Sequence, residues 1–501
     1  MEDARQRQAE VILAMHNQDL GHTGDAHRPI EALPQETSIE RVPPEILSLF
    51  FIFAKPSDLA DCIPSRRRPP LTFLQVCSLW RTVALATPDL WTDLCISLRG
   101  DSVQWKPAAL DKLATQWFSL AGPHTRLSLQ FEDYISPNHI YDFSNIILSR
   151  SERFRQLKIS FLITSSLAAF IRGDGNASST FSQLEDLTIP TQREMGIRFA
   201  AAGCLRRMTL GIYFHAWEGM KSFAPWEQLT YLEIGFLPEA AWVSLLSQCI
   251  NLETGTFTIR TCDIDPIPTV NVTMAHLTSL NVRFSWAGPS SVELFDGFRF
   301  PVLTSLHMEP ERDFSWRHPE HFYDQLGSLR TLSFVGTSVE LVNLLRHTPS
   351  LVALHATTNT HLDPLLLALT ATNESDPLVP ELKQLTIQAT RWTVSTPSGG
   401  PLVTMIASRT RYSDAYGCQL EHLTVVVPIV ERHGDDSLEL GRQLRELDMS
   451  MVREFHRLLS GSAGGGTVVE YVWRQAGSQA SGSTEPFSVI TPFDVFRHFQ
   501  R

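Results

Sequence analysis

The residue groupings that could support chemistry are few. His318 and His321 are separated by two residues, a spacing at which two imidazoles on one helical turn can bind zinc. Pro319 lies between them and disfavours a regular helix, so a surface loop is the better interpretation. The stretches 262–265 and 433–436 also contain ligand-type side chains, but each is more typical of a polar turn between other elements.

The motifs of common catalytic classes are also missing from the sequence. It contains no G-x-S-x-G, no G-x-G-x-x-G after a strand and no H-E-x-x-H. The glycine run 464–466 is not followed by the lysine of a phosphate-binding loop. We therefore expect a protein that is not an enzyme and that uses neither a metal nor a cofactor.

Composition narrows the class of protein further. The 501 residues are 43% hydrophobic and 19% charged, which is typical of a folded chain. The net charge of −12 argues against nucleic acid as a partner. The seven cysteines are odd in number and form no C-x-x-C pair, which favours free thiols in a reducing compartment. No apolar window has signal-peptide or membrane-span length, so we expect a cytoplasmic or nuclear protein without a membrane partner.

Two apolar helices are expected near the start of the chain. In the first, Pro43 and Pro44 suit a helix entry and Glu45 suits the positive end of the helix dipole. Apolar residues then recur at helical spacing up to Pro56. The second helix covers residues 73–84 and is followed by the alternating strand pattern of Leu94, Ile96 and Leu98. Between the helices lies a loop with the run Arg66–Arg68, either solvated or facing an acidic partner.

The rest of the sequence has a repeat. The pattern Leu-x-x-Leu-x-apolar returns every 21 to 31 residues, with one gap of about 38, which fits leucine-rich repeats. Two apolar residues separated by one position point to the same side of a strand, and stacked turns bury them together. One copy has Gly255 in place of its middle leucine. The copies begin at Phe154, Leu184, Leu205, Leu229, Leu252, Leu277, Leu303, Leu329, Leu351, Leu382, Leu420 and Leu444.

These patterns predict an α/β protein with four parts. Residues 1–37 are a polar tail, and residues 38–98 form a small helical domain. Residues 99–460 form an irregular leucine-rich-repeat solenoid, with parallel strands on the concave side and helices or loops outside. Residues 461–501 are a Gly/Ser-rich tail, in which Val469, Tyr471 and Trp473 make a last capping strand.

The helical domain resembles an F-box. The resemblance rests on Pro43-Pro44-Glu45-Ile46-Leu47, on Val76-Cys77-x-x-Trp80-Arg81 and on the following Ala-Leu-Ala-Thr-Pro-Asp-Leu-Trp. This arrangement is similar to the large F-box family of mushroom-forming fungi, whose members often continue into leucine-rich repeats. The sequence departs from that pattern in the gap of residues 55–70, which is longer than in a compact F-box.

The resemblance implies a substrate-recognition subunit of a Skp–cullin–F-box ubiquitin ligase. Such a subunit binds a Skp-type adaptor, and through it a cullin, and holds a protein substrate on its repeats. The motif implies an adaptor-facing set and a set in internal packing. The first set is Pro44, Leu47, Leu74 and Trp80. The second set is Ile46, Phe50, Val76 and Cys77.

The repeats also define a candidate face for the substrate. In each copy, the residue between the two inward strand positions points away from the core. These residues are Lys158, Thr188, Thr209, Glu233, Asn281, His307, Ser333, His355, Thr386 and Thr424. They are mostly neutral and indicate no ligand charge. The alternative function is a repeat scaffold for protein interaction that acts outside any ubiquitin ligase.

Overall fold

The computed structural model describes most of the predicted domains and little of the tails. The chain divides into two compact units, here called the N-terminal unit (residues 1–236) and the C-terminal unit (residues 237–501). The tail of residues 1–37 and the repeat copy at Leu444 lie outside the described residues. Among the described residues, every helix is too short or too polar to traverse a bilayer. The structure describes residues 42–97, 107–132, 147, 149–159, 181–189, 199, 202–211, 220–221, 223–260, 268–285, 294–310, 320–358, 361–371, 378–389, 399–411, 420–429 and 468–475.

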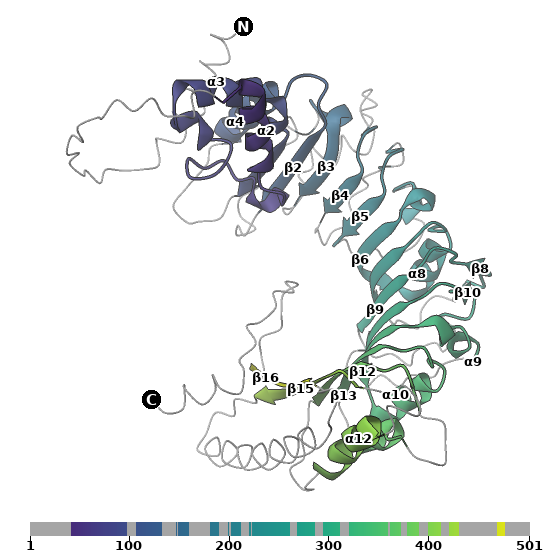
Figure 1. Ribbon diagram of the computed structural model, residues 1–501. Helices are drawn as coiled ribbons and strands as arrows, with labels where there is room; N and C mark the ends of the chain where they lie inside the picture. Colours follow the sequence, from purple (N-terminus) through teal and green to yellow (C-terminus); the bar gives the residue numbers. More distant parts are fainter. Residues whose placement is uncertain are drawn as a thin grey trace, which may run out of the picture. The chain divides into compact units, whose positions relative to one another are not determined.

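The N-terminal unit begins with a helical module (Figure 1). Its two α-helices pack on each other, with the rings of Phe51 in α2 and Trp80 in α3 4.9 Å apart. Phe51 also stacks on Phe73 of the turn between them, with centroids 4.3 Å apart. The second helix is capped by Cys77, whose Sγ accepts the Trp80 N–H at 3.5 Å. The module comprises α2 (Pro44–Phe53), η3 (Leu59–Asp61), η4 (Phe73–Gln75), α3 (Ser78–Ala86) and η5 (Pro88–Trp91).

Parallel strands follow the module in chain order. Five parallel ladders join the six strands of this unit in chain order. The helix after β1 is α4 (Pro107–Leu120), and its Trp117 ring meets Trp91 edge-on at 5.0 Å, so the module and the strands share a core. The strands are β1 (Asp93–Ser97), β2 (Leu127–Glu132), β3 (Phe154–Ile159), β4 (Asp186–Ile189), β5 (Arg207–Leu210) and β6 (Tyr231–Pro238). Single turns η6 (Ser151–Arg153) and η7 (Trp226–Gln228) precede β3 and β6.

The C-terminal unit repeats the same arrangement. Its strands run β7-β9-β11-β12-β13-β14-β15-β16 and are parallel, while β8 and β10 form a separate two-stranded parallel sheet. The predicted last strand is confirmed as β16, which pairs with β15. The strands are β7 (Thr254–Arg260), β8 (Val272–Thr273), β9 (Ser279–Ser285), β10 (Phe298–Arg299), β11 (Ser305–Pro310), β12 (Thr331–Gly336), β13 (Ala353–Thr358), β14 (Gln384–Ala389), β15 (His422–Ile429) and β16 (Val468–Gln475).

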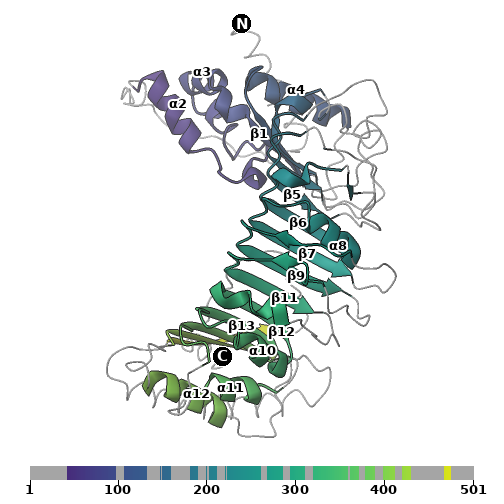
Figure 2. The same ribbon diagram turned by 90° about the vertical axis from the view of Figure 1, so that its right-hand side faces the viewer.

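Helices of the C-terminal unit lie on one side of its sheet (Figure 2). α10 packs on α11, and α11 packs on α12. α10 begins with a capping box: the Thr337 N–H donates to Glu340 Oε2 at 3.1 Å, and the Glu340 N–H donates to Thr337 Oγ1 at 3.3 Å. The helices are α8 (Glu239–Leu246), α9 (Glu320–Tyr323), η8 (Leu326–Ser328), α10 (Ser338–Leu345), α11 (Asp363–Leu369) and α12 (Gly399–Arg411).

The repeated leucines make the core in both units. Both inward strand positions of each described copy are buried, as are the leucines that precede the strands. The expected alternation and the α/β solenoid of successive parallel strands are therefore confirmed. Beside β7 the apolar filling is aromatic, because the ring of Trp242 is within 6.0 Å of the rings of Phe257, Phe295 and Phe298. The sequence periodicity did not indicate this cluster.

Gly255 shows why one copy lacks its middle leucine. A Cβ atom at this position would lie 2.6 Å from Phe257 Cε2 and 3.2 Å from Leu252 Cδ2. The Phe257 ring thus occupies the volume that a leucine fills in the other copies. Repeat-like packing is preserved by a glycine and a large ring in place of two branched side chains.

We expect Gly255→Ala to lower the free energy of unfolding by about 1–3 kcal/mol, the usual cost of forcing an extra group into a packed core. The measurement is urea unfolding, and Gly327→Ala is the matched control because no atom lies within 4 Å of its added Cβ. A second substitution, Phe257→Leu, should restore part of the loss in Gly255→Ala. Equal stability of the two alanine variants would contradict the packing argument.

Candidate protein-docking surfaces

An apolar surface lies on α2. Ile46, Leu49, Phe50 and Phe53 are between 50% and 86% exposed, and Phe53 is the most exposed of them. Their spacing of three and four residues places them on one face of the helix. We call these four residues the apolar stripe. Val76, in the turn before α3, is also more than half exposed.

The buried face of α2 is a different one. Leu47 and Phe51 are four residues apart and are covered by the module itself, Leu47 at 3% exposure and Phe51 completely. Leu74 is completely buried as well. The assignment of Leu47 and Leu74 to an adaptor-facing surface is therefore wrong for the chain as it folds alone, because neither side chain reaches the surface.

The assignment of Ile46, Phe50 and Val76 to internal packing is also wrong, because all three are more than half exposed. α2 is apolar on two sides, and the other elements of the module cover only one of them. The spacing of apolar residues marks α2 as a helix with apolar faces, but it does not show which face meets the core. Cys77 is partly buried, and it contributes a cap rather than a core contact.

The remaining two residues of the implied adaptor set stay near the surface. Pro44 is exposed in the first turn of α2. Trp80 is half-buried, and its ring lies edge-on to Phe50 of the apolar stripe, with centroids 6.4 Å apart. Trp80 therefore packs against the stripe at Phe50, while the buried rings of Phe51 and Phe73 lie against the same indole.

The arginine run between the helices is partly used within the chain. Arg68 Nη1 lies 3.2 Å from Asp61 Oδ1, and both side chains are largely exposed. Such a surface ion pair stabilises a fold only weakly. The loop that carries it is nevertheless anchored at its start, where Lys55 and Cys62 contact the first strand.

The second candidate surface is the outward side of the strands. In the N-terminal unit the pairing registers join Lys158 to Thr188, Thr188 to Thr209 and Thr209 to Glu233. All four residues are half-buried. The register therefore places the predicted positions in one row across four neighbouring strands.

The C-terminal unit has a longer row of the same kind. Here the registers join Asn281, His307, Ser333, His355, Thr386 and Thr424 in that order. We call these six residues the C-terminal row. His355 is exposed and the others are half-buried, so polar groups of the row can reach a ligand.

Charged side chains near the C-terminal row are paired. Arg283 Nη2 and His307 Nε2 approach Glu309 Oε2 at 2.8 Å and 3.6 Å. The hydrogen bond from His307, together with the Arg283 charge, holds the pKa of the Glu309 carboxyl below its usual range although partial burial opposes this. Lys383 Nζ lies 2.8 Å from Glu421 Oε1. These neighbouring charges are balanced, so the surface presents hydroxyl, amide and imidazole groups more than net charge.

Within the residues that the structure describes, no metal site offers an alternative to these two surfaces. No group of three or more His, Cys, Asp or Glu side chains is placed to hold a metal there. His318 and the stretches 262–265 and 433–436 lie outside the described residues. Cys62, Cys77, Cys204 and Cys249 are free thiols.

Comparison with known proteins assigns no family. A scan against protein-family models finds no match, and no curated protein matches the sequence. The assignment of a role to the apolar stripe and to the outward rows therefore depends on their own chemistry.

Proposed function

We propose that the protein is the substrate-recognition subunit of a Skp–cullin–F-box ubiquitin ligase and that it is not itself an enzyme. The apolar stripe is the observation that carries this proposal. It lies on the helix that begins with the F-box-like residues Pro43–Leu47, a helix to which that resemblance assigns adaptor contacts, although on another face than the motif implies. The proposed adaptor contacts are Pro44, the four stripe residues and the exposed Val76.

The stripe has the chemistry of a protein interface. Monomeric proteins seldom expose several large apolar side chains side by side, and a patch of this kind usually marks a contact with another protein. Full burial of each such side chain contributes roughly 1.5–3 kcal/mol before the costs of association. Four of them on one helix form the apolar centre of the proposed contact.

The outward rows are the proposed substrate-binding surface. They lie on successive strands at one sequence position per repeat, so an extended segment can contact several repeats at once. Because the charges beside the C-terminal row are balanced, we expect the bound segment to be recognised through hydrogen bonds of uncharged polar groups. Binding to both surfaces holds a substrate lysine near activated ubiquitin and so raises its effective concentration.

The proposal is tested by co-expressing the intact chain with a Skp-type adaptor and separating the products by size-exclusion chromatography. A single peak that contains both proteins in equal amounts is the expected result. If the chain elutes without the adaptor at micromolar concentrations, the ligase function is rejected. The outward rows would then support the alternative function, a repeat scaffold outside any ligase.

A further inference from the structure

The first strand of the N-terminal unit has an edge that does not face β2. In a parallel ladder, successive backbone groups point alternately to the two sides of a strand. The Ser128 N–H of β2 donates to Thr92 O at 2.9 Å, so the neighbouring groups of Asp93 and Cys95 point to the opposite edge. An uncovered edge of this kind leaves backbone donors and acceptors without strand partners.

Two contacts close this edge. The Cys95 N–H donates to the backbone oxygen of Cys62 at 3.0 Å. At the same edge, the Trp117 indole N–H donates to Asp93 O at 3.1 Å. Cys62 belongs to the long gap between the two halves of the F-box-like motif, so this part of the gap contacts the sheet rather than extending into solvent.

The side chains of the same segment also cover β1. Leu59 and Cys62 form an apolar cluster with Cys95 of β1, and Ile63 packs against that cluster. Burial, followed by the nearby Asp93 charge, raises the pKa of the Cys62 thiol to about 11. A neutral, covered thiol at this position is consistent with tight packing of the segment on the strand.

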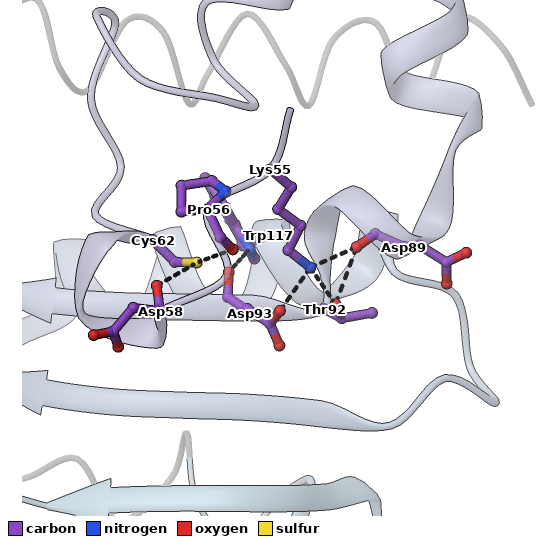
Figure 3. Close-up of polar contacts among 8 residues, drawn as sticks. All are labelled: Lys55, Pro56, Asp58, Cys62, Asp89, Thr92, Asp93 and Trp117. Carbon is purple, nitrogen blue, oxygen red and sulfur yellow. Dashed lines mark hydrogen bonds and ion pairs between the residues drawn. The ribbon is translucent and has the colours of Figure 1, made fainter. Parts of the chain in front are cut away.

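Lys55 joins the start of the segment to β1 and to the turn before it (Figure 3). Its Nζ lies 2.6 Å from Asp93 Oδ2 and donates to Asp89 O and Thr92 Oγ1, each at 2.7 Å. The Lys55 side chain is only 13% exposed. The three oxygens use the three hydrogens of the ammonium group and leave it little freedom to move.

We infer that residues Lys55–Ile63 form the N-terminal cap of the solenoid and that Lys55 is the residue that positions this cap. A repeat array needs a cap at each end, because its end strands would otherwise expose their backbone and their apolar face. The same segment directly follows α2. The cap therefore sets the orientation of the apolar stripe with respect to β1, a consequence that rests on the proposed function.

The cap is tested by the rate at which N-ethylmaleimide labels Cys62, measured by peptide mass spectrometry on the intact chain. Cys204 is exposed and is the reference thiol in the same sample. In the parent chain, Cys62 should react far more slowly than Cys204. Lys55→Met should increase the Cys62 rate by about tenfold or more, because charge-assisted hydrogen bonds hold the segment down.

Three further variants separate positioning from general unfolding. Lys55→Arg keeps the charge and should restore most of the protection of Cys62, and Asp93→Asn should accelerate labelling less than Lys55→Met. Lys112→Met, an exposed lysine of α4, is the matched control and should leave the rate unchanged. Cys249 is completely buried in the C-terminal unit and should stay protected in every variant if the chain remains folded.

Two results would overturn the inference. If Cys62 of the parent chain reacts as fast as Cys204, the segment is not docked on β1. If Lys55→Met leaves Cys62 as protected as in the parent chain, Lys55 does not position the cap. Both readouts use the chain without the adaptor, so a failed adaptor complex and a failed cap are distinguishable.

Discussion

We expect Phe53→Asp to weaken binding of the proposed Skp-type adaptor by about 30-fold or more while the chain keeps its melting temperature. Phe53 is the most exposed large apolar residue of the apolar stripe, at 86%, so the substitution removes no internal contact of note. At the interface it would place a carboxylate against apolar partner atoms, and truncation of an interface hot spot alone costs about 2 kcal/mol or more. Isothermal titration calorimetry with purified adaptor measures the change.

Val339→Asp and Leu367→Asp are the matched controls for this prediction. Each replaces an apolar residue that is 61% exposed, on α10 and α11 of the C-terminal unit. Neither should change the affinity for the adaptor. Loss of binding in these variants as well as in Phe53→Asp would point to a general effect of added charge and would contradict a contact at the stripe.

Leu47 and Trp80 are unsuitable for the same test, although the sequence motif suggests them. Leu47 is buried against the module, and the ring of Trp80 touches those of Phe50, Phe51 and Phe73. Substitution of either residue would disturb the helical module and would remove adaptor binding for that reason alone. Exposed stripe residues separate the loss of a surface from the loss of the fold.

Arg409→Met will lower the free energy of unfolding of the C-terminal unit by about 3 kcal/mol or more. Arg409 of α12 is completely buried. It donates from Nε to Leu369 O at 2.9 Å, from Nη1 to Val379 O at 3.2 Å and from Nη2 to Leu378 O at 2.7 Å. Methionine fills similar volume but leaves these carbonyl groups without the guanidinium donors, and a buried acceptor without a donor is costly.

Val379 adds to the expected effect. Its φ of 49° lies in the left-handed region, which is unfavourable for a β-branched residue. The bond from Arg409 to its carbonyl group helps to hold this backbone, so loss of the guanidinium removes a restraint on a strained turn. Hydrogen exchange of the peptides around α11 and α12 should therefore accelerate more than that of β7 and β9.

Arg346→Met is the control for Arg409→Met, because Arg346 is exposed at the end of α10 and bonds only to the nearby Asn343 among the contacts described. This variant should lie within about 0.5 kcal/mol of the parent chain. Arg409→Lys should be intermediate, since one ammonium group cannot reach all three carbonyl groups. A stability of Arg409→Met equal to that of Arg346→Met would show that the buried guanidinium is dispensable.

The repeat architecture was predictable from the sequence because its signal is local and recurrent. Each copy places leucines where a strand must turn two side chains inward, and the registers of the structure align the outward residues Lys158 to Glu233 and Asn281 to Thr424 as expected. Pro44 and Glu45 likewise mark the start of α2 through chemistry that acts within one turn. For these features, neighbouring residues are sufficient to determine the outcome.

Only tertiary structure decided which apolar residues are covered. α2 has two apolar faces. Which of them is buried depends on Phe73 and Trp80, which lie further along the chain and pack on Phe51. The docking of Lys55–Ile63 on β1, the Phe257 ring over Gly255 and the burial of Arg409 have the same origin. The periodicity of one helix or strand shows how its apolar side chains are spaced. Which of these side chains are buried depends on the other elements that pack against them.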